Sequence, residues 1–247
     1  MIRGKTSEGA EDMSAELLSI KGLNAWYKED KKILRDFSIS LNKNEVVGLI
    51  GLNGAGKTTF MKVLTGLLKT YEAADKKFEG AELDFRDDIF KKSRYAVFAE
   101  DDSFKYFTFR EYMEYVSRAY GVKMQDVADM VRGFHFEEFE NTLLKDLSTG
   151  NRKKAFLITA FALRPKLLLL DEPVNGLDFQ STEYLYGLIA GYKEYGTLLF
   201  SSHILESITL TSDRVLVLEN GAIAQKFEGD EITADSVREA LRYEDVI

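Results

Sequence analysis

The stretch that decides the fold is Gly51-Leu52-Asn53-Gly54-Ala55-Gly56-Lys57-Thr58, a complete G-x-x-x-x-G-K-[ST] pattern. A continuous apolar run, Val46–Ile50, precedes it and is typical of a strand buried on both faces. A helical stretch follows it from Lys57 to about Leu68. Glycines let the backbone curl so that its N–H groups point at phosphate oxygens, and the helix N-terminus adds its positive dipole end. We therefore predict nucleotide binding, with Lys57 on the β and γ phosphates and the Thr58 hydroxyl on Mg²⁺.

Two acids end a second predicted buried strand. The run Leu167–Leu170 is followed directly by Asp171 and Glu172. The carboxyl ends of strands lie beside the phosphate loop in open α/β sheets. Asp171 is placed there to hold Mg²⁺ through water, and Glu172 to orient or deprotonate the water that attacks the γ-phosphate. Taken alone, an apolar run ending in two acids is also an ordinary strand terminus, and the upstream loop favours the functional interpretation.

The segment Leu147-Ser148-Thr149-Gly150-Asn151 stands ahead of a basic helix start, Arg152-Lys153-Lys154. Ser148 is a plausible helix N-cap. A helix N-terminus with a serine hydroxyl and a glycine is also a phosphate site. The chain then carries two phosphate-binding helix ends but one phosphate loop. A simple explanation is that the second helix end serves the nucleotide of a neighbouring molecule.

Composition excludes several other classes of protein. The 247 residues carry 33 Lys+Arg against 41 Asp+Glu, a formal charge of −8 that argues against a general nucleic-acid binder. The chain has no Cys, so neither a disulfide nor a thiolate nucleophile is possible. Its apolar runs fall far short of the roughly 18 residues that a membrane span needs. We expect a cytosolic protein that works at a membrane only through another, membrane-spanning protein.

The pattern along the chain predicts an α/β fold with an inserted helical part. Residues 1–13 are expected to be a disordered leader and residues 14–247 one nucleotide-binding domain. Within it, residues 14–100 and 148–247 form an α/β core that begins with β elements at Leu17–Leu23 and Ile33–Leu41. Residues 101–147 are rich in Phe, Tyr and Met at helical spacing, which predicts a helical subdomain. Asn220-Gly221 predicts the turn of a late hairpin.

In their order and spacing these motifs resemble those of the ATP-binding subunit of an ABC transporter, over about Leu17 to Phe227. Gly51–Thr58 then corresponds to the Walker A loop, 147–151 to the signature motif, 166–172 to Walker B and 175–178 to the D-loop. The resemblance implies a RecA-like P-loop NTPase core with N-terminal antiparallel β elements and an inserted α-helical subdomain. It also implies an ATPase that uses ATP and Mg²⁺.

Roles for individual residues follow from this resemblance. The implied catalytic residues are Glu172, Lys57 and His203, the last as a neutral imidazole that donates to the γ-phosphate. The implied metal ligands are Thr58, Asp171 and Glu100. The implied nucleotide-binding residues are Tyr27, Asn53, Gly54, Ala55, Gly56, Lys57, Thr58, Thr59, Ser148 and Gly150. Tyr27 takes the place of the aromatic residue that stacks on adenine, although the adjacent Trp26 is a second candidate.

Three positions depart from the family pattern. The signature reads LSTGN rather than LSGGQ, but Ser148 and Gly150 are retained. Glu100 stands where the family has the Q-loop glutamine, and an ionised carboxylate accepts hydrogen bonds but cannot donate them. Leu52 replaces a frequent proline, which we expect to be harmless. The resemblance therefore still implies a working ATPase, with the role of Glu100 the least defined.

The resemblance also implies partners. Two ATP-binding subunits pair head to tail, each ATP lies between one Walker A loop and the other signature, and an integral membrane permease carries the substrate. The protein is then cytoplasmic, at the inner face of the cell membrane, and the motifs resemble single-domain subunits of export or ABC-2 systems. The permease would dock near Phe104, Tyr106 and Phe107, so one or two of these rings should be exposed.

Two other functions remain alternatives. A soluble ABC ATPase that drives assembly of a cytosolic complex, such as an iron–sulfur scaffold, has the same motifs. A P-loop kinase is disfavoured because it explains neither the signature motif nor His203. A DNA-repair ABC protein is excluded, since no coiled-coil insert separates the Walker A loop from the signature.

Overall fold

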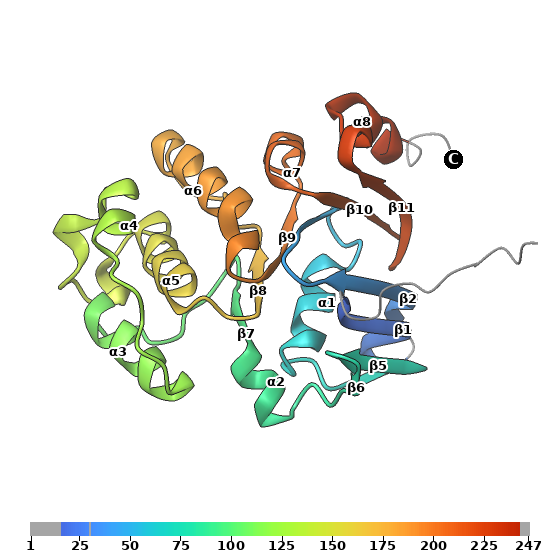
Figure 1. The fold of residues 1–247 in the computed structure, drawn as a ribbon, viewed down its shortest axis with the longest axis horizontal. Helices are drawn as coiled ribbons and strands as arrows, with labels where there is room; N and C mark the ends of the chain where they lie inside the picture. Colours follow the sequence, from blue (N-terminus) through green and yellow to red (C-terminus); the bar gives the residue numbers. More distant parts are fainter. Residues whose placement is uncertain (1–15, 30, 243–247) are drawn as a thin grey trace, which may run out of the picture.

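A computed structural model describes residues 16–29 and 31–242 of the chain. The predicted leader at residues 1–13 lies outside this range. The described residues form two β-sheets, with one helix between them and the other long helices on the far face of the larger sheet (Figure 1). This arrangement is the predicted α/β P-loop fold with an antiparallel sheet at its N-terminal end.

The larger sheet has six strands in the order β11-β10-β3-β9-β8-β7. Neighbours from β10 to β7 pair in parallel, and only β11 runs antiparallel to its neighbour. The strands are β3 (Val46–Ile50), β7 (Arg94–Val97), β8 (Leu167–Asp171), β9 (Thr197–Ser202), β10 (Arg214–Glu219) and β11 (Ala222–Glu228). Because β3 and β8 flank β9 in parallel register, the carboxyl ends of all three strands meet at one edge.

Both faces of this sheet are covered, as the apolar runs predict. Successive side chains of a strand point to opposite faces. Leu167 and Leu169 therefore pack toward the helix α1 (Lys57–Leu64), whereas Leu168 and Leu170 pack toward the outer helices. The outer helices are α5 (Thr149–Leu163), α6 (Phe179–Gly191), α7 (Leu205–Thr211) and α8 (Ala234–Arg242).

The smaller sheet is antiparallel and packs on the other side of α1. Its strands are β1 (Glu16–Lys28), β2 (Lys31–Asn42), β4 (Tyr71–Glu72), β5 (Asp75–Phe78) and β6 (Ala81–Glu82). A short helix, α2 (Asp88–Ser93), then leads into β7. A second apolar core lies between this sheet and the larger sheet. In it, Phe37 of β2 packs on Phe60 of α1 with ring centroids 4.5 Å apart.

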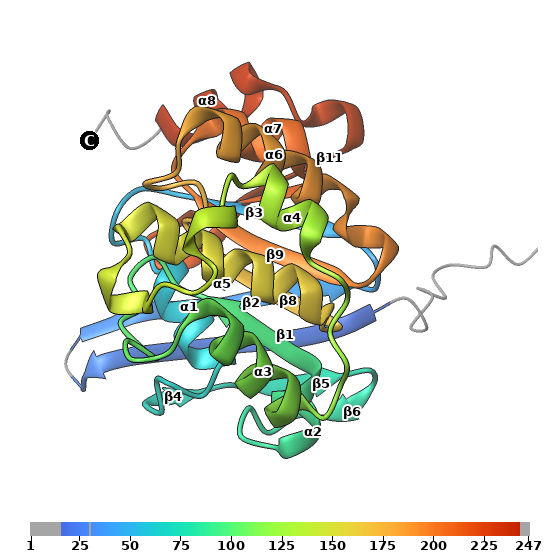
Figure 2. The same cartoon turned by 90° about the vertical axis from the view of Figure 1, so that its left-hand side faces the viewer.

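The segment between β7 and α5 is helical. It contains α3 (Phe109–Tyr120), α4 (Ala128–Gly133) and two short 3₁₀ turns, Glu137–Phe139 and Leu144–Asp146. Figure 2 shows α3, α4 and α5 facing the viewer in front of the strands. A capping box between Thr108 and Glu111 starts α3. We propose that residues 101–147 are a subdomain of their own, as the aromatic spacing predicts.

Two predicted boundaries are wrong. The helix after the phosphate loop ends at Leu64 rather than near Leu68, because Gly66 has a φ of 72° and turns the chain away. The first strand continues to Lys28 instead of ending at Leu23, so Trp26 and Tyr27 are strand residues. Within the described residues, no helix combines the length and the apolar character needed to cross a membrane.

Candidate nucleotide-binding site

The glycine-rich loop connects β3, at the centre of the larger sheet, to α1. Its last glycine, Gly56, is the N-cap of α1 and has a φ of 116°. This φ strains any residue with a side chain, and a Cβ atom there would lie 2.7 Å from Cδ2 of Leu34, so the Leu34 side chain would also have to shift. The N–H groups of α1 thus begin at the carboxyl end of β3, as the sequence predicts.

Lys57 lies over this loop. Its Nζ donates to the carbonyl oxygen of Gly51 at 2.6 Å and to that of Leu52 at 3.3 Å. It also lies 3.8 Å from Oε1 of Glu172. Burial lowers the pKa of the Lys57 ammonium, and the carboxylates of Glu172 and Asp171 oppose this shift. The structure thus brings the predicted lysine to the predicted acids.

Asp171 is buried at the end of β8, where it accepts two hydroxyl hydrogen bonds. Thr58 donates to it at 2.8 Å from α1, and Ser201 donates at 2.7 Å from the neighbouring strand β9. The Ser201 hydroxyl also accepts from the backbone N–H of Glu172 at 3.0 Å. Our sequence analysis gave Ser201 no role. The only signal in the sequence was its position two residues before His203.

Glu172 and His203 meet next to these groups. Oε2 of Glu172 lies 2.8 Å from Nδ1 of His203, which extends from the end of β9. The Glu172 backbone is left-handed, with a φ of 49°. The carboxylate therefore lies between the Lys57 ammonium and the imidazole, and the three predicted catalytic residues form one cluster.

This contact restricts the arrangements in which His203 can have its predicted role. A neutral imidazole that donates Nδ1–H to the Glu172 carboxylate carries no proton on Nε2. Donation from Nε2 to a γ-phosphate in this position therefore requires the imidazolium. The predicted neutral donor fits only an arrangement in which His203 releases Glu172.

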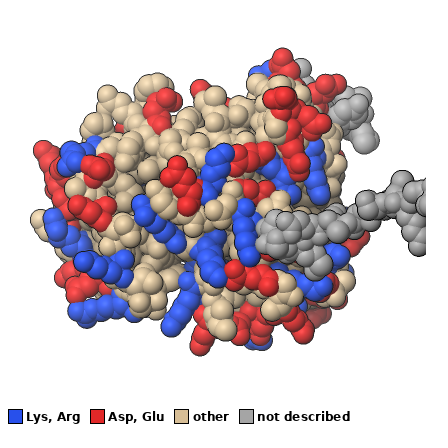
Figure 3. Space-filling model, viewed as in Figure 1, with Lys and Arg blue, Asp and Glu red and all other residues tan. Residues whose placement is uncertain are grey.

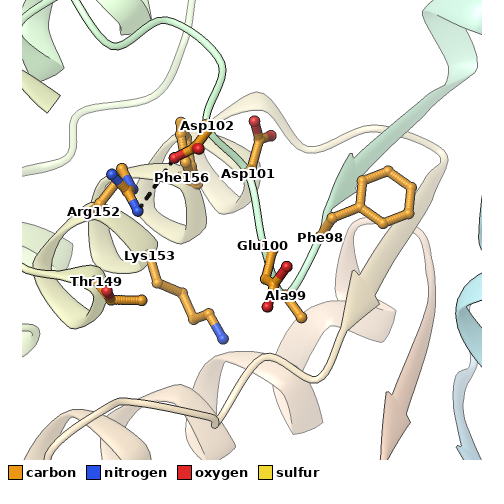
Figure 4. Close-up of a pocket in the computed structure, with 9 residues that line it drawn as sticks. All are labelled: Phe98, Ala99, Glu100, Asp101, Asp102, Thr149, Arg152, Lys153 and Phe156. Atoms are coloured by element: carbon orange, nitrogen blue, oxygen red, sulfur yellow. Dashed lines mark ion pairs between the residues drawn. The ribbon is translucent and has the colours of Figure 1, made fainter. Parts of the chain in front are cut away.

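The residues expected to hold Mg²⁺ are only partly brought together. The Thr58 hydroxyl and the Asp171 carboxylate are adjacent, and hard oxygen donors of this kind suit Mg²⁺. Glu100 lines a cavity of about 290 Å³ with Thr149, Arg152 and others, and Figure 4 shows these side chains around it. Among the described residues, no hydrogen bond links Glu100 to the other two predicted ligands.

The predicted second phosphate site lies at the start of α5. Ser148 is the N-cap, and its hydroxyl accepts from the N–H of Asn151 at 3.2 Å. Ser148 and Thr149 are exposed. A Cβ atom on Gly150 would lie 2.5 Å from the carbonyl oxygen of Gly176, so the helix start packs closely on the loop after β8.

The aromatic candidates differ in exposure. Tyr27 is 53 % exposed, whereas its neighbour Trp26 is half-buried, so Tyr27 is the more accessible ring for a base. In the second group, Tyr106 is 76 % exposed, and Phe104 and Phe107 are partly buried against the core. The prediction that one or two of these three rings are exposed is confirmed.

The fold and this cluster define a class of protein, the P-loop nucleoside triphosphatases. Comparison with known proteins makes the assignment narrower. The sequence profile described as ABC transporter matches residues 34–175, which is more than half of the chain. The chain therefore belongs to the ABC transporter family, as an ATP-binding subunit that hydrolyses ATP.

Individual relatives agree with this assignment. AlbC of Bacillus subtilis, which carries the name ABC transporter ATP-binding protein, is 36 % identical over 84 % of this chain and 90 % of its own. A solved structure of an ATP-binding subunit of an ABC transporter is 27 % identical, with a TM-score of 0.79 over 92 % of this chain and 94 % of that one.

Two further relatives carry opposite directions of transport in their names. The SkfA peptide export protein SkfE of Bacillus subtilis is 31 % identical over 85 % of this chain and 88 % of its own. The phosphate import protein PstB of Saccharolobus solfataricus is 28 % identical over 94 % and 93 %. Membership of the family therefore does not determine the direction of transport.

Proposed function

We propose that the protein powers export by a membrane transporter, through ATP hydrolysis at a site built by Lys57, Thr58, Asp171, Glu172 and His203. The observation that carries the proposal is the position of the Glu172 carboxylate. It lies 3.8 Å from Lys57 Nζ and 2.8 Å from His203 Nδ1, next to the Thr58–Asp171 pair. A carboxylate in this place faces the γ-phosphate end of a nucleotide bound to the loop.

Each residue has a defined task in this proposal. The Gly51–Thr58 loop binds the phosphates, and Tyr27 stacks on the adenine. Glu172 accepts a proton from water as that water attacks the γ-phosphorus and the bond to the ADP oxygen breaks. Lys57 meets the charge that develops on the transferring group. Catalysis is then positioning and electrostatics, which needs no covalent nucleophile.

Mg²⁺ fits this donor set. Thr58 would hold it directly and Asp171 through water, and the bound ion would neutralise phosphate charge. The 2.8 Å hydrogen bond from the Thr58 hydroxyl to the Asp171 carboxylate supports this assignment, because it brings the two oxygen ligands close together. Glu100 is proposed as a third ligand, although it lines the neighbouring cavity.

The exposed start of α5 supports a second subunit. Ser148 and Thr149 face solvent, where they are available to the nucleotide of another molecule. Leu52 in the phosphate loop is 49 % exposed and Phe179 at the start of α6 is 78 % exposed. Apolar groups of this size suit a contact that forms on closure. We infer a head-to-tail dimer that closes over two ATP molecules.

The membrane partner and the direction of transport rest on less direct support. The exposed Tyr106 ring beside the partly buried Phe104 and Phe107 suits an apolar contact with a permease segment. Such a contact would place the protein at the cytoplasmic face of a membrane. Export is favoured by the LSTG signature and the NGLD loop, which resemble those of export or ABC-2 systems.

Replacing the proposed base tests the proposal. The Glu172→Gln variant should lose turnover, keep its affinity for ATP and elute as a dimer with MgATP in size exclusion. Lys57→Ala should instead weaken ATP binding itself. Normal hydrolysis by Glu172→Gln would show that Glu172 is not the base. An ATP-bound monomer of that variant would contradict the shared site.

A further inference from the structure

A second buried lysine reaches the same turn as the catalytic cluster. Lys153, in the first turns of α5, is 5 % exposed. Its Nζ donates to the backbone carbonyl oxygen of Glu172 at 3.0 Å and to that of Asn175 at 2.7 Å. Figure 4 shows its side chain extended away from α5, apart from its neighbour Arg152.

Burial of the Lys153 ammonium costs free energy, so the contacts that Lys153 makes need an explanation. A buried ammonium is unfavourable unless its donors are satisfied. Among the described residues, no ion pair includes Lys153, and its recorded partners are two carbonyl oxygens of one turn. That turn lies between the end of β8 at Asp171 and the start of α6 at Phe179.

The backbone of Glu172 needs such support. Its φ of 49° is an uncommon and strained conformation for a residue with a side chain. The conformation persists only where the surroundings fix it. Ser201 of β9 accepts from the Glu172 N–H at 3.0 Å, and Lys153 of α5 donates to its carbonyl. The N–H and the carbonyl oxygen of Glu172 are thus held by two different elements, β9 and α5.

We propose that Lys153 is a positioning residue, whose ammonium clamps the Glu172–Asn175 turn and thereby holds the Glu172 carboxylate between Lys57 and His203. The inference rests on the proposed role of Glu172 as the base. Helix α5, which carries Lys153, also carries Ser148 at its N-cap. Helix α5 would then contact the nucleotide of the second subunit through Ser148 and fix the catalytic base of its own subunit through Lys153.

A set of single variants tests the clamp. Lys153→Met keeps the bulk and removes the donor, so kcat should fall by about 100-fold, the cost of a misplacement on the order of 1 Å, while KM for ATP changes less than about threefold. Lys153→Gln keeps an N–H donor without the charge and should recover about a tenth or more of the wild-type kcat. Lys91→Met, which removes an exposed lysine of α2 paired with Asp88, is the matched control and should leave kcat unchanged.

A second measurement separates positioning from general stability. If Lys153 acts through Glu172, adding Lys153→Met to Glu172→Gln should lower the residual rate by less than about twofold. A further loss of the full single-variant size, or a rise in KM with kcat retained, overturns the inference. If Lys153→Met does not fold, Lys153→Gln carries the test: a kcat below about a tenth of the wild type, or a loss of kcat that recurs in full in the Glu172→Gln background, overturns the role.

The outcome for Glu172 is read independently. Wild-type hydrolysis by Glu172→Gln alone overturns the proposed base, and the clamp with it. An inactive Glu172→Gln together with a fully active Lys153→Met overturns only the clamp.

Discussion

Tyr27 and Trp26 are neighbours on β1, but their surroundings differ. Tyr27 is 53 % exposed, and the Lys62 ammonium lies 5.9 Å from its ring centroid. Trp26 is half-buried, with Lys32 at 5.8 Å. A base that enters from solvent would meet the tyrosine ring, and the lysine beside it lies on the helix that follows the phosphate loop.

The stacking role of Tyr27 is therefore testable. Tyr27→Ala should raise the Kd for ATP by about 5–100-fold, because stacking on an aromatic ring is worth roughly 1–3 kcal/mol. Tyr27→Phe keeps the ring and should bind like the wild type. Titration followed by the fluorescence of Trp26, the single tryptophan of the chain, measures both. Unchanged affinity in Tyr27→Ala would transfer the role to Trp26.

The two nitrogens of His203 make separable predictions. His203→Asn places an amide nitrogen near the position of Nδ1 and keeps the contact with Glu172, which is 2.8 Å in the wild type. His203→Asn has no counterpart of the second ring nitrogen, Nε2. If the γ-phosphate contact matters, kcat should fall by about 10–1,000-fold in both His203→Asn and His203→Ala. Single-turnover hydrolysis measures this, and near-normal rates in His203→Asn would limit His203 to orienting Glu172.

Sequence reasoning can select candidate residues whose chemistry is local. Lys57 and Thr58 follow from the glycine loop, and Glu172 from its place after an apolar strand. Lys153 and Ser201 could not be found this way, because their roles depend on contacts with a turn 19 residues away and a strand 30 residues away. A lysine in a basic helix start looks like a solvated charge until tertiary structure buries it.

At the scale of elements, α5 and α6 are joined by one charged contact. Nζ of Lys154 lies 2.6 Å from Oδ2 of Asp178, and Lys154 also donates to the carbonyl of Phe134. Asp178 is the N-cap of α6 and accepts from the N–H of Ser181 at 2.9 Å. The Lys154 and Ser181 hydrogen bonds hold the pKa of the Asp178 carboxyl well below its usual range.

Removing the two partners should have unequal effects. Asp178→Ala removes the cap and leaves the Lys154 charge buried and unneutralised, so the free energy of unfolding should fall by about 2–4 kcal/mol. Lys154→Met replaces the buried ammonium by an apolar chain and should cost less than about 1 kcal/mol. Urea denaturation compares the two variants. Equal losses would show that the pair itself, rather than the stranded lysine, determines the cost.

The same contact predicts a dependence on pH. Because the folded-state pKa of Asp178 is lowered, its stabilisation is present above the pKa of the unfolded carboxyl, roughly 3.9, and is lost as the pH falls further. Asp178→Asn keeps the cap without the charge. Its stability should therefore decline less than that of the wild type below about pH 4.

Element ends were the least predictable part of the fold. The central strands β3 and β8 of the larger sheet were predicted, because each is a short continuous apolar run buried on both faces. The end of α1 was missed, since Leu67 and Leu68 continue an apolar pattern beyond the turn at Gly66. The length of β1 was missed because its second half is stabilised by pairing with β2 and β4, which periodicity within one segment does not show.

At the scale of the whole molecule, candidate site residues come from both sheets. The larger sheet brings β3, β8 and β9 to one edge, and the smaller sheet places Tyr27 beside α1. Acidic and basic side chains are intermixed across the face shown in Figure 3. With a formal charge of −8, the molecule as a whole has no attraction for a polyanion, so binding of ATP depends on local groups.

This dependence gives a prediction for the stability of the whole protein. A ligand that binds only the folded state stabilises it by RT ln(1 + [L]/Kd), about 2.7 kcal/mol at 100 times Kd. MgATP should raise the Tm of Glu172→Gln, and excess EDTA should remove most of this gain if Thr58 and Asp171 hold the ion.

Because a closed dimer binds its nucleotide between two copies, the gain in Tm with MgATP should also increase with protein concentration, and the gain in Tm with MgADP should not. Scanning calorimetry at two protein concentrations measures this. A gain that is independent of protein concentration would mean that one subunit encloses ATP by itself.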